Sequence, residues 1–378
     1  MTTAHAPERA VARIDLGAVE RNCAHLRTLL REDTELCAVV KANAYGHGDV
    51  WCAKAALAGG ATWLAVAAAG EAAELRHHGV DARLLVMGAL TPEEMRVALE
   101  SAADVVAWEP GLVDALAAQA ETSGLRARVH VKLDTGMGRL GTKDSEQALA
   151  VADAIAHAEH LELAGLMTHF ATADEPGDDF FPKQLDTFTT FAEHWRKAHP
   201  GTTVHAANSA ATYRDPASHF DMVRCGIAVY GLDPFQEDPT ARGLEPALAL
   251  ESYVAAVRRF EPGDSAGYGR RWTASEPTWV ATLPIGYGDG WRRALTNNAE
   301  VLIAGRRHPL VGTVSMDNIT VDLGAKTDVE VGAPAVLIGS QGGERILCEE
   351  VARRIGTINY EITCGLSTRA RRMWSASG

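Results

Sequence analysis

The chain has 378 residues, of which 47% are hydrophobic and 22% are charged, and its formal net charge is -13. This composition predicts a globular protein, because disordered chains contain fewer apolar residues. The negative charge argues against nucleic acid as a partner, since non-specific binding to phosphates requires a positive surface. The first ten residues lack the apolar segment of a signal peptide, and the longest apolar stretch, 63–70, falls far short of the roughly 20 residues that span a membrane.

The cysteines are scattered along the chain, and none forms a C-x-x-C pair. In a chain of this length such cysteines indicate reduced, mostly buried thiols. We therefore expect a cytoplasmic protein and no metal site. The six positions are Cys23, Cys37, Cys52, Cys225, Cys348 and Cys364.

Short β-type runs alternate with helical patterns over the first two thirds of the chain. Eight such runs predict an α/β fold, a closed (β/α)8 TIM barrel of parallel strands, whereas six or seven would favour an open sheet. The helix expected at 16–30 precedes the first of them. The candidate strands are 36–41, 62–66, 83–87, 104–107, 127–133, 163–168, 203–207 and 222–224.

Beyond about residue 240 the pattern changes to β runs separated by Gly, Pro, Asp and Asn turns, which predicts a second, mainly β domain. We expect residues 1–240 to form the barrel and residues 241–378 to form the C-terminal domain. It stays open whether the first stretch of about 10 to 15 residues joins the second domain.

Lys41 ends the first candidate strand, in AVVKANAYGHG, where a Gly-rich turn with one tyrosine follows it. Reactive groups of barrels lie at the C-terminal ends of the strands. A lysine in partly apolar surroundings has a lowered pKa, so its free amine can form a Schiff base with an aldehyde. The alternative is an ordinary strand-end lysine that reaches solvent.

The fifth candidate strand carries polar residues on one face. Alternation places His130, Lys132 and Asp134 together, and Arg139 follows in a Gly-rich turn. Buried cations need an anionic partner or neutralisation, so we expect a phosphate, a substrate carboxylate or a modified Lys132 here. The G-x-G-x-x-G pattern at 136–141 also fits a dinucleotide site, but it follows the fifth strand and contains an arginine, which favours an anion clamp.

Three further strand ends offer polar groups to the same end of the barrel. Each alone is weak, because a strand-end histidine is often purely structural. Ser209 and the amides near Gly226 and Ile227 suit phosphate binding, as loops after the seventh and eighth barrel strands often do. The three groups are Thr168-His169, Asn208-Ser209 and Arg224 through Ile227.

Eight motifs in this order and spacing closely resemble those of the alanine racemases, over nearly the whole chain. They are AVVKANAYGHG, KLDTGMGRLG, MTHFATAD, HAANSAA, VRCGIAVYG, SAGYGRRW, LPIGYGDGW and GTVSMDN. The resemblance implies a pyridoxal 5'-phosphate enzyme of fold type III that interconverts L- and D-alanine for peptidoglycan synthesis. It also implies a head-to-tail homodimer with composite active sites and alanine as the small-molecule substrate.

The resemblance also implies roles for individual residues. Lys41 matches the lysine that binds the cofactor aldehyde and acts as one base, and Tyr268 matches the opposite base from the partner subunit. Two positioned groups can remove the α-proton on one face and return it on the other. His169 and Arg224 resemble the chain that tunes the tyrosine, and Arg224 should also contact the pyridine nitrogen, weakening the electron sink.

Further matches concern the cofactor, the substrate and the entrance. Asn208 is expected to bind the cofactor next to the phosphate contacts, Arg139 matches a contact of the substrate carboxylate, and Lys132 matches a carbamylated lysine. Met316 offers its amide to the substrate from the partner chain beside Asp317, and Tyr287 resembles an entrance residue. The residues that match phosphate contacts are Tyr45, Ser209, Gly226, Ile227 and Tyr360.

Departures from the family pattern occur at Ser315, Thr313 and Asn318, where many members have cysteine, arginine and glutamine. These departures affect the entrance. Two alternatives are a barrel protein that binds the cofactor without turnover and a fold-type III decarboxylase. The C-terminal domain argues against the first, and the lack of a decarboxylase motif around Cys364 argues against the second.

Overall fold

A computed structural model describes residues 8–376, which form two compact units. One unit is Val19–Val229, and the other combines the described residues through Ala18 with those from Tyr230 onward. In the described part of the chain, no helix is both long and apolar enough to cross a membrane.

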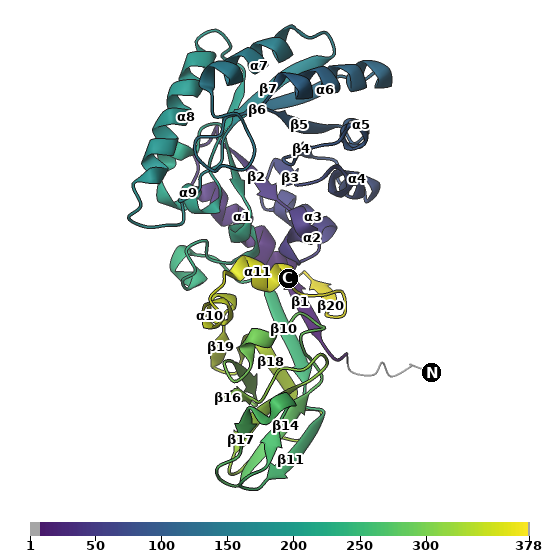
Figure 1. Cartoon of the computed structure of the whole chain (residues 1–378), viewed down its shortest axis with the longest axis vertical. Coiled ribbons are helices and arrows are strands. Elements are labelled where there is room, and N and C mark those ends of the chain that lie inside the picture. Colours follow the sequence, from purple (N-terminus) through teal and green to yellow (C-terminus); the bar gives the residue numbers. More distant parts are fainter. Residues whose placement is uncertain (1–7, 377–378) are drawn as a thin grey trace. The chain divides into compact units, whose positions relative to one another are not determined.

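The first unit is a closed barrel of eight parallel strands (Figure 1). The strands pair in chain order, and β9 closes the barrel by pairing with β2, so the predicted (β/α)8 fold is confirmed. All eight candidate strands are present. They are β2 (Glu35–Val39), β3 (Trp63–Val66), β4 (Arg83–Val86), β5 (Ala103–Ala107), β6 (Ala127–Lys132), β7 (Leu161–Met167), β8 (Thr203–His205) and β9 (Met222–Cys225).

Helices connect consecutive strands and bury their apolar faces. Their ends follow local chemistry: Thr91 caps α5 by accepting a hydrogen bond from the Glu94 amide at 3.3 Å, with proline next to it. The helices of this part of the chain are α1 (Leu16–Thr28), α2 (Lys41–Tyr45), α3 (Asp49–Ala58), α4 (Ala69–His77), α5 (Pro92–Glu100), α6 (Pro110–Ser123), α7 (Ser145–His157), α8 (Phe180–Arg196) and α9 (Ser209–Arg214).

The second unit is mainly β, as predicted. Its large sheet runs in the order β11-β14-β17-β16-β15-β18-β10-β1-β20, with β19 paired to β18. The N-terminal strand β1 (Val11–Asp15) lies between β10 and β20 of this sheet. The other elements are β10 (Leu248–Tyr253), β11 (Ala256–Phe260), β12 (Ser265–Ala266), β13 (Trp272–Thr273), β14 (Thr278–Leu283), β15 (Glu300–Ile303), β16 (Arg306–Val311), β17 (Ile319–Gly324), β18 (Pro334–Gln341), β19 (Glu344–Ile346), β20 (Arg371–Ser375), α10 (Cys348–Arg354) and α11 (Asn359–Cys364).

The first barrel strand is shorter than its apolar run suggests. We expected it to extend to Lys41, but β2 ends at Val39, and Lys41 begins α2. The Val40 amide still donates to the carbonyl of Ala65 at 2.8 Å, so the chain leaves the barrel only after this residue. Lys41 therefore lies in the turn that follows the strand, at its C-terminal end.

That turn is left-handed. Ala42, Asn43, Ala44 and Tyr45 all have φ between 52° and 54°, although none is glycine. Such a conformation costs an L-residue roughly 1–2 kcal/mol, so surrounding contacts must stabilise it.

Glu71 of α4 supplies part of that stabilisation. Its carboxylate accepts hydrogen bonds from the amides of Ala42 at 2.7 Å, Ala67 at 2.8 Å and Ala68 at 3.1 Å. The buried His47 ring lies 2.9 Å from the Ala44 carbonyl and adds a second restraint. The position of Lys41 thus depends on residues from the next βα unit.

Replacing Glu71 with alanine should loosen this turn. We expect the Glu71→Ala variant to lose about 1–2 kcal/mol of unfolding free energy, because three backbone amides lose their acceptor. Hydrogen exchange at the Ala42 amide should accelerate. The control is Glu74→Ala on the same helix, whose carboxylate lies 3.4 Å from an exposed histidine, His78. Unchanged exchange at Ala42 would contradict the assigned role of Glu71.

Candidate active site

The interior of the barrel holds a chain of polar side chains. His130 Nε2 lies 3.0 Å from Asp104 Oδ2, His130 Nδ1 lies 2.8 Å from His205 Nε2, and His205 Nδ1 lies 2.7 Å from Arg224 Nη1. All four residues are buried. The predicted polar face of strand 127–133 thus points inward, with His130 at its centre.

Arg224 ends this chain and is held from several sides. Its Nη2 group donates to the carbonyls of Thr168 at 2.8 Å and Ala206 at 2.9 Å, and it lies 3.3 Å from His169 Nδ1. Burial lowers the pKa of Arg224 to about 10. Burial and the nearby charge of Arg224 hold the pKa of His169 well below its usual range, so this imidazole is neutral.

Lys132 adds a second buried cation beside Arg224. Burial, followed by the charges of Arg224 and Arg139, lowers the pKa of Lys132 to about 8. No hydrogen bond or ion pair of its ammonium occurs with the residues that the structure describes. The carboxylate of Asp134 instead accepts hydrogen bonds from the amides of Gly136 and Gly138 at 3.0 Å, which shapes the Gly-rich turn.

Lys41 and Arg139 lie close enough to His169 for their charges to affect its pKa. The charges of Lys132, Arg139 and Lys41 contribute, after Arg224, to the depressed pKa of His169. The barrel thus brings together four predicted cations from three strand ends, those of β2 (Lys41), β6 (Lys132 and Arg139) and β9 (Arg224). An anionic ligand is the natural complement to such a cluster.

A small polar cradle lies between the ends of β8 and β9. The Ser209 hydroxyl accepts hydrogen bonds from the amides of Gly226 at 3.0 Å and Ala228 at 3.4 Å, and Asn208 caps the following turn through the Ala211 amide. A Cβ on Gly226 would lie 2.3 Å from the Tyr45 hydroxyl, so this position requires glycine.

The cradle therefore unites Tyr45, Asn208, Ser209 and Gly226, with Ile227 next in the chain. Its hydroxyls and backbone amides are the groups that bind phosphate in proteins. Together with the cations around Lys41, this donor set fits a ligand that carries a phosphate.

In the second unit, Tyr268 is highly exposed, with 72% of its surface accessible. The Thr313 hydroxyl donates to its carbonyl at 2.7 Å. Tyr268 lines a hollow of about 400 Å³ together with Thr313, Ser315 and Asn318. All three departures from the family pattern thus gather around this tyrosine.

Two neighbouring loops of the same unit hold the remaining predicted residues. The amide of Tyr287 donates to Ser315 at 3.0 Å, and the amide of Gly288 donates to Met316 at 2.9 Å. Asp317 pairs with Arg369 at 2.7 Å, which also pairs with Asp289 at 3.1 Å. The structure therefore brings Tyr287, Met316 and Asp317 together.

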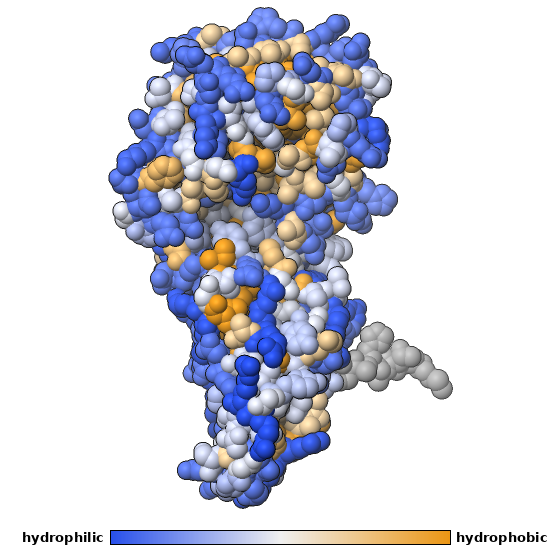
Figure 2. All heavy atoms as spheres, viewed as in Figure 1, coloured by the Kyte–Doolittle hydropathy of each residue, from blue (hydrophilic) through white to orange (hydrophobic). Residues whose placement is uncertain are grey.

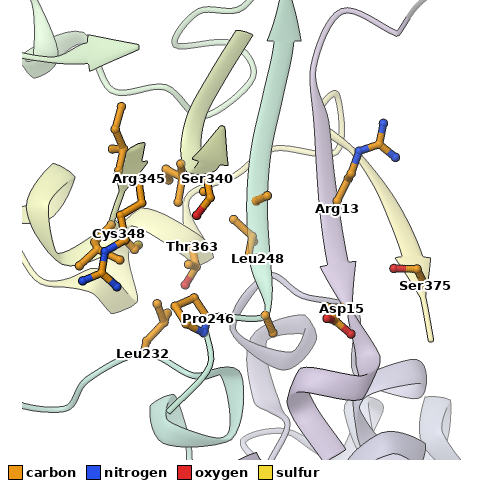
Figure 3. A pocket seen from close by; sticks show the side chains of 16 residues that line it. Arg13, Asp15, Leu232, Pro246, Leu248, Ser340, Arg345, Cys348, Thr363 and Ser375 are labelled. Atoms are coloured by element: carbon orange, nitrogen blue, oxygen red, sulfur yellow. The ribbon is translucent and has the colours of Figure 1, made fainter. Parts of the chain in front are cut away.

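Tyr360 lies on α11 of the second unit, half-buried. A separate hollow of about 300 Å³ opens between β1, β10 and β18, and none of the predicted site residues lines it (Figure 3). Of its charged groups, Arg13 pairs with Glu251 at 2.6 Å and Arg345 pairs with Asp238, so these cations are already matched. We assign no chemistry to this hollow.

Sequence reasoning missed three residues of this architecture. Asp104 lies in an apolar strand run, Glu71 lies in a helix, and His205 lies in the HAANSAA motif without an assigned role. Asp104 and His205 are polar residues at inward-facing positions of strands, and this was the signal that could have identified them. No local signal marks Glu71.

The comparisons with known proteins agree over nearly the whole chain. The family models described as "Alanine racemase, N-terminal domain" and "Alanine racemase, C-terminal domain" match residues 14–234 and 247–374. The alanine racemase of Symbiobacterium thermophilum is 42% identical over 364 residues, which are 96% of each chain. That of Geobacillus stearothermophilus is 42% identical, over 96% of this chain and 92% of the relative.

Solved structures give the same result. The crystal structure of alanine racemase from the D-cycloserine producer Streptomyces lavendulae superposes with a TM-score of 0.93, at 38% identity, over 99% of this chain and 98% of that one. The Bacillus anthracis enzyme with bound L-Ala-P superposes with a TM-score of 0.90, at 39% identity, over 99% and 97%. The chain therefore belongs to the alanine racemase family.

Proposed function

We propose that this protein is an enzyme that interconverts L- and D-alanine with pyridoxal 5'-phosphate as cofactor. The observation that carries the proposal is the group of cations at Lys41, Lys132, Arg139 and Arg224 beside the cradle of Ser209 and Gly226. The names of the relatives, which extend over nearly the whole chain, support alanine as the substrate.

When bound, pyridoxal 5'-phosphate supplies an aldehyde that condenses with amines and a ring that withdraws electrons from the α-carbon. Lys41 would hold that aldehyde through its amine. The hydroxyls of Ser209 and Tyr45 and the amides of Gly226 and Ile227 would bind the phosphate, with Asn208 shaping the turn. Tyr360 is a further phosphate contact in this proposal.

Two groups would move the α-proton. The Lys41 amine serves one face of the substrate, and the Tyr268 phenol serves the other. The exposure of Tyr268, and of Met316 and Tyr287 in the same unit, supports a role toward a second copy of the chain. We therefore propose a homodimer in which each site takes its tyrosine from the partner.

Arg224 would face the ring nitrogen of the cofactor. A guanidinium donates hydrogen bonds and cannot accept one, so it would keep that nitrogen unprotonated and limit carbanion stabilisation. His169 beside it would tune the tyrosine. Arg139 and the amide of Met316 would bind the substrate carboxylate, with Asp317 supporting Met316 and Tyr287 lining the entrance.

We also propose a cellular role and a location for this activity. D-alanine is a building block of peptidoglycan, and we place the enzyme in the cytoplasm. In this proposal residues 1–240 form the cofactor-binding domain, and residues 241–378 form the domain that supplies Tyr268.

Chiral analysis of alanine tests the activity. The purified protein loaded with pyridoxal 5'-phosphate should convert either enantiomer of alanine to an equal mixture of both. A sample reduced with borohydride, in which the bond to the lysine is fixed, should be inactive. Retention of configuration from both enantiomers, with or without release of carbon dioxide, would rule out a racemase.

Tyr268→Phe separates the two bases. In deuterated water this variant should lose racemisation by about 100-fold or more, because one face has no proton donor. Exchange at the α-carbon of D-alanine should persist through Lys41, while L-alanine should not exchange. Tyr253→Phe, in the same unit but outside the Tyr268 hollow, should behave like the wild type. Equal exchange of both enantiomers in Tyr268→Phe would refute the two-base assignment.

Lys132 should carry a carbamate. Carbon dioxide adds only to a free amine, forming a nitrogen–carbon bond and releasing a proton, and the pKa of about 8 makes that amine accessible near neutral pH. We expect a carbamate signal in ¹³C NMR with labelled bicarbonate that weakens as the pH falls below 8, where the amine of Lys132 is protonated. Lys132→Ala should abolish the signal, whereas Lys143→Ala, in the exposed part of the same loop, should retain it. A signal that survives Lys132→Ala would disprove the assignment.

A further inference from the structure

The chain of polar side chains inside the barrel extends well beyond Arg224. It crosses from β9 to β8, β6 and β5 through Arg224, His205, His130 and Asp104. His130 and His205 have no exposed surface, and Asp104 and Arg224 expose only 4% and 3%. Because all four side chains are buried, the hydrogen bonds among them constrain where the protons of the two histidines lie.

The chemistry of the two ends allows only one such arrangement. The guanidinium of Arg224 can only donate, so His205 Nδ1 must accept, and the proton of His205 lies on Nε2. That proton is donated to His130 Nδ1, which places the His130 proton on Nε2, facing the Asp104 carboxylate. Both rings are then neutral, and every donor points toward Asp104.

Charge supports this arrangement. Burial and the adjacent Arg224 hold the pKa of His205 well below its usual range, so the ring does not gain a second proton. A second proton would also place two donors against each other at the 2.7 Å contact with Arg224. Hydrogen bonds in a row polarise one another, so the carboxylate at one end strengthens the acceptor at the other.

Neighbouring residues fix the positions of these side chains. A Cβ on Gly165 would lie 2.3 Å from His130 Nδ1, so a glycine there makes room for the ring. The Trp63 ring meets His130 edge-on, with centroids 5.9 Å apart. Arg128 Nε donates to Asp104 Oδ1 at 3.1 Å and fixes the second carboxylate oxygen.

We propose that Asp104 is a positioning residue for the active site, which fixes the tautomers of His130 and His205 and thereby orients the Arg224 guanidinium. The proposal rests on the proposed function, in which Arg224 faces the cofactor ring. Both terminal nitrogens of Arg224 are engaged, by His205 and by the carbonyls of Thr168 and Ala206. No hydrogen bond of the Arg224 Nε group is found among residues 8–376. These contacts of the terminal nitrogens would therefore direct the Nε donor toward the cofactor ring.

The first arm of the test is independent of turnover. Two-dimensional ¹⁵N NMR of histidine-labelled protein, recorded with the cofactor bound and without substrate, should show His130 and His205 as neutral rings protonated on Nε2. Assignments come from His130→Gln and His205→Gln. A wild-type His205 protonated on Nδ1, or on both nitrogens, would overturn the proposal even if the protein is a fully active racemase.

The second arm uses Asp104→Asn, which keeps the shape and removes the charge. We expect the His205 ¹⁵N resonances and the cofactor absorbance maximum to shift, and kcat to fall roughly 10-fold, while KM for alanine changes less than about twofold. Asp153→Asn is the matched control, because Asp153 also pairs with a histidine, His157, at 3.4 Å, but both side chains are exposed. It should change none of these quantities.

The outcomes separate the two claims. A folded Asp104→Asn variant with unchanged resonances, absorbance and kcat would refute the positioning role and leave the racemase intact. Absence of racemase activity in the wild type would refute the proposed function, while the tautomers would still be decided by NMR. If Asp104→Asn does not fold, Asp104→Glu replaces it, because this variant keeps the negative charge. It should show the wild-type resonances of His205, and different resonances would count against the proposal.

Discussion

The concentration of positive charge at one end of the barrel is the constraint on which the rest of the site depends. Lys132 and Arg224 are buried, and Lys41 and Arg139 lie close enough to affect the same histidine. Buried cations are unfavourable unless they are neutralised or paired. Burial lowers the pKa of both Lys132 and Arg224. The positive charge that remains is complementary to an anionic ligand.

The closed barrel makes this concentration possible. Its strands place the ends of β2, β6, β7, β8 and β9 around one opening, so residues far apart in the chain meet without long loops. The same closure lets polar side chains cross the interior, where the buried carboxylate of Asp104 bonds to His130. Each unit keeps its own apolar core, and the visible face is mostly hydrophilic with scattered apolar residues (Figure 2).

The sequence allowed the barrel, its eight strands and the mainly β second unit to be predicted, because alternation and strand spacing are local signals. The cradle of Ser209 and Gly226 was also predictable from strand ends. The left-handed turn after Lys41 was not, since four residues other than glycine adopt it and Glu71, from another βα unit, stabilises it. Asp104 was missed because a single polar residue in an apolar strand gives no indication of its partner, His130, which lies on the neighbouring strand β6.

The identity of the lysine that would bind pyridoxal 5'-phosphate in the proposed function is the most direct test of this account. The holoprotein is reduced with borohydride, digested and mapped by mass spectrometry, which locates the lysine bonded to pyridoxal phosphate. We expect the label on the peptide that contains Lys41, and none on Lys132. A label on Lys132, or on any other lysine, would contradict the assignment of Lys41 as the centre of the site.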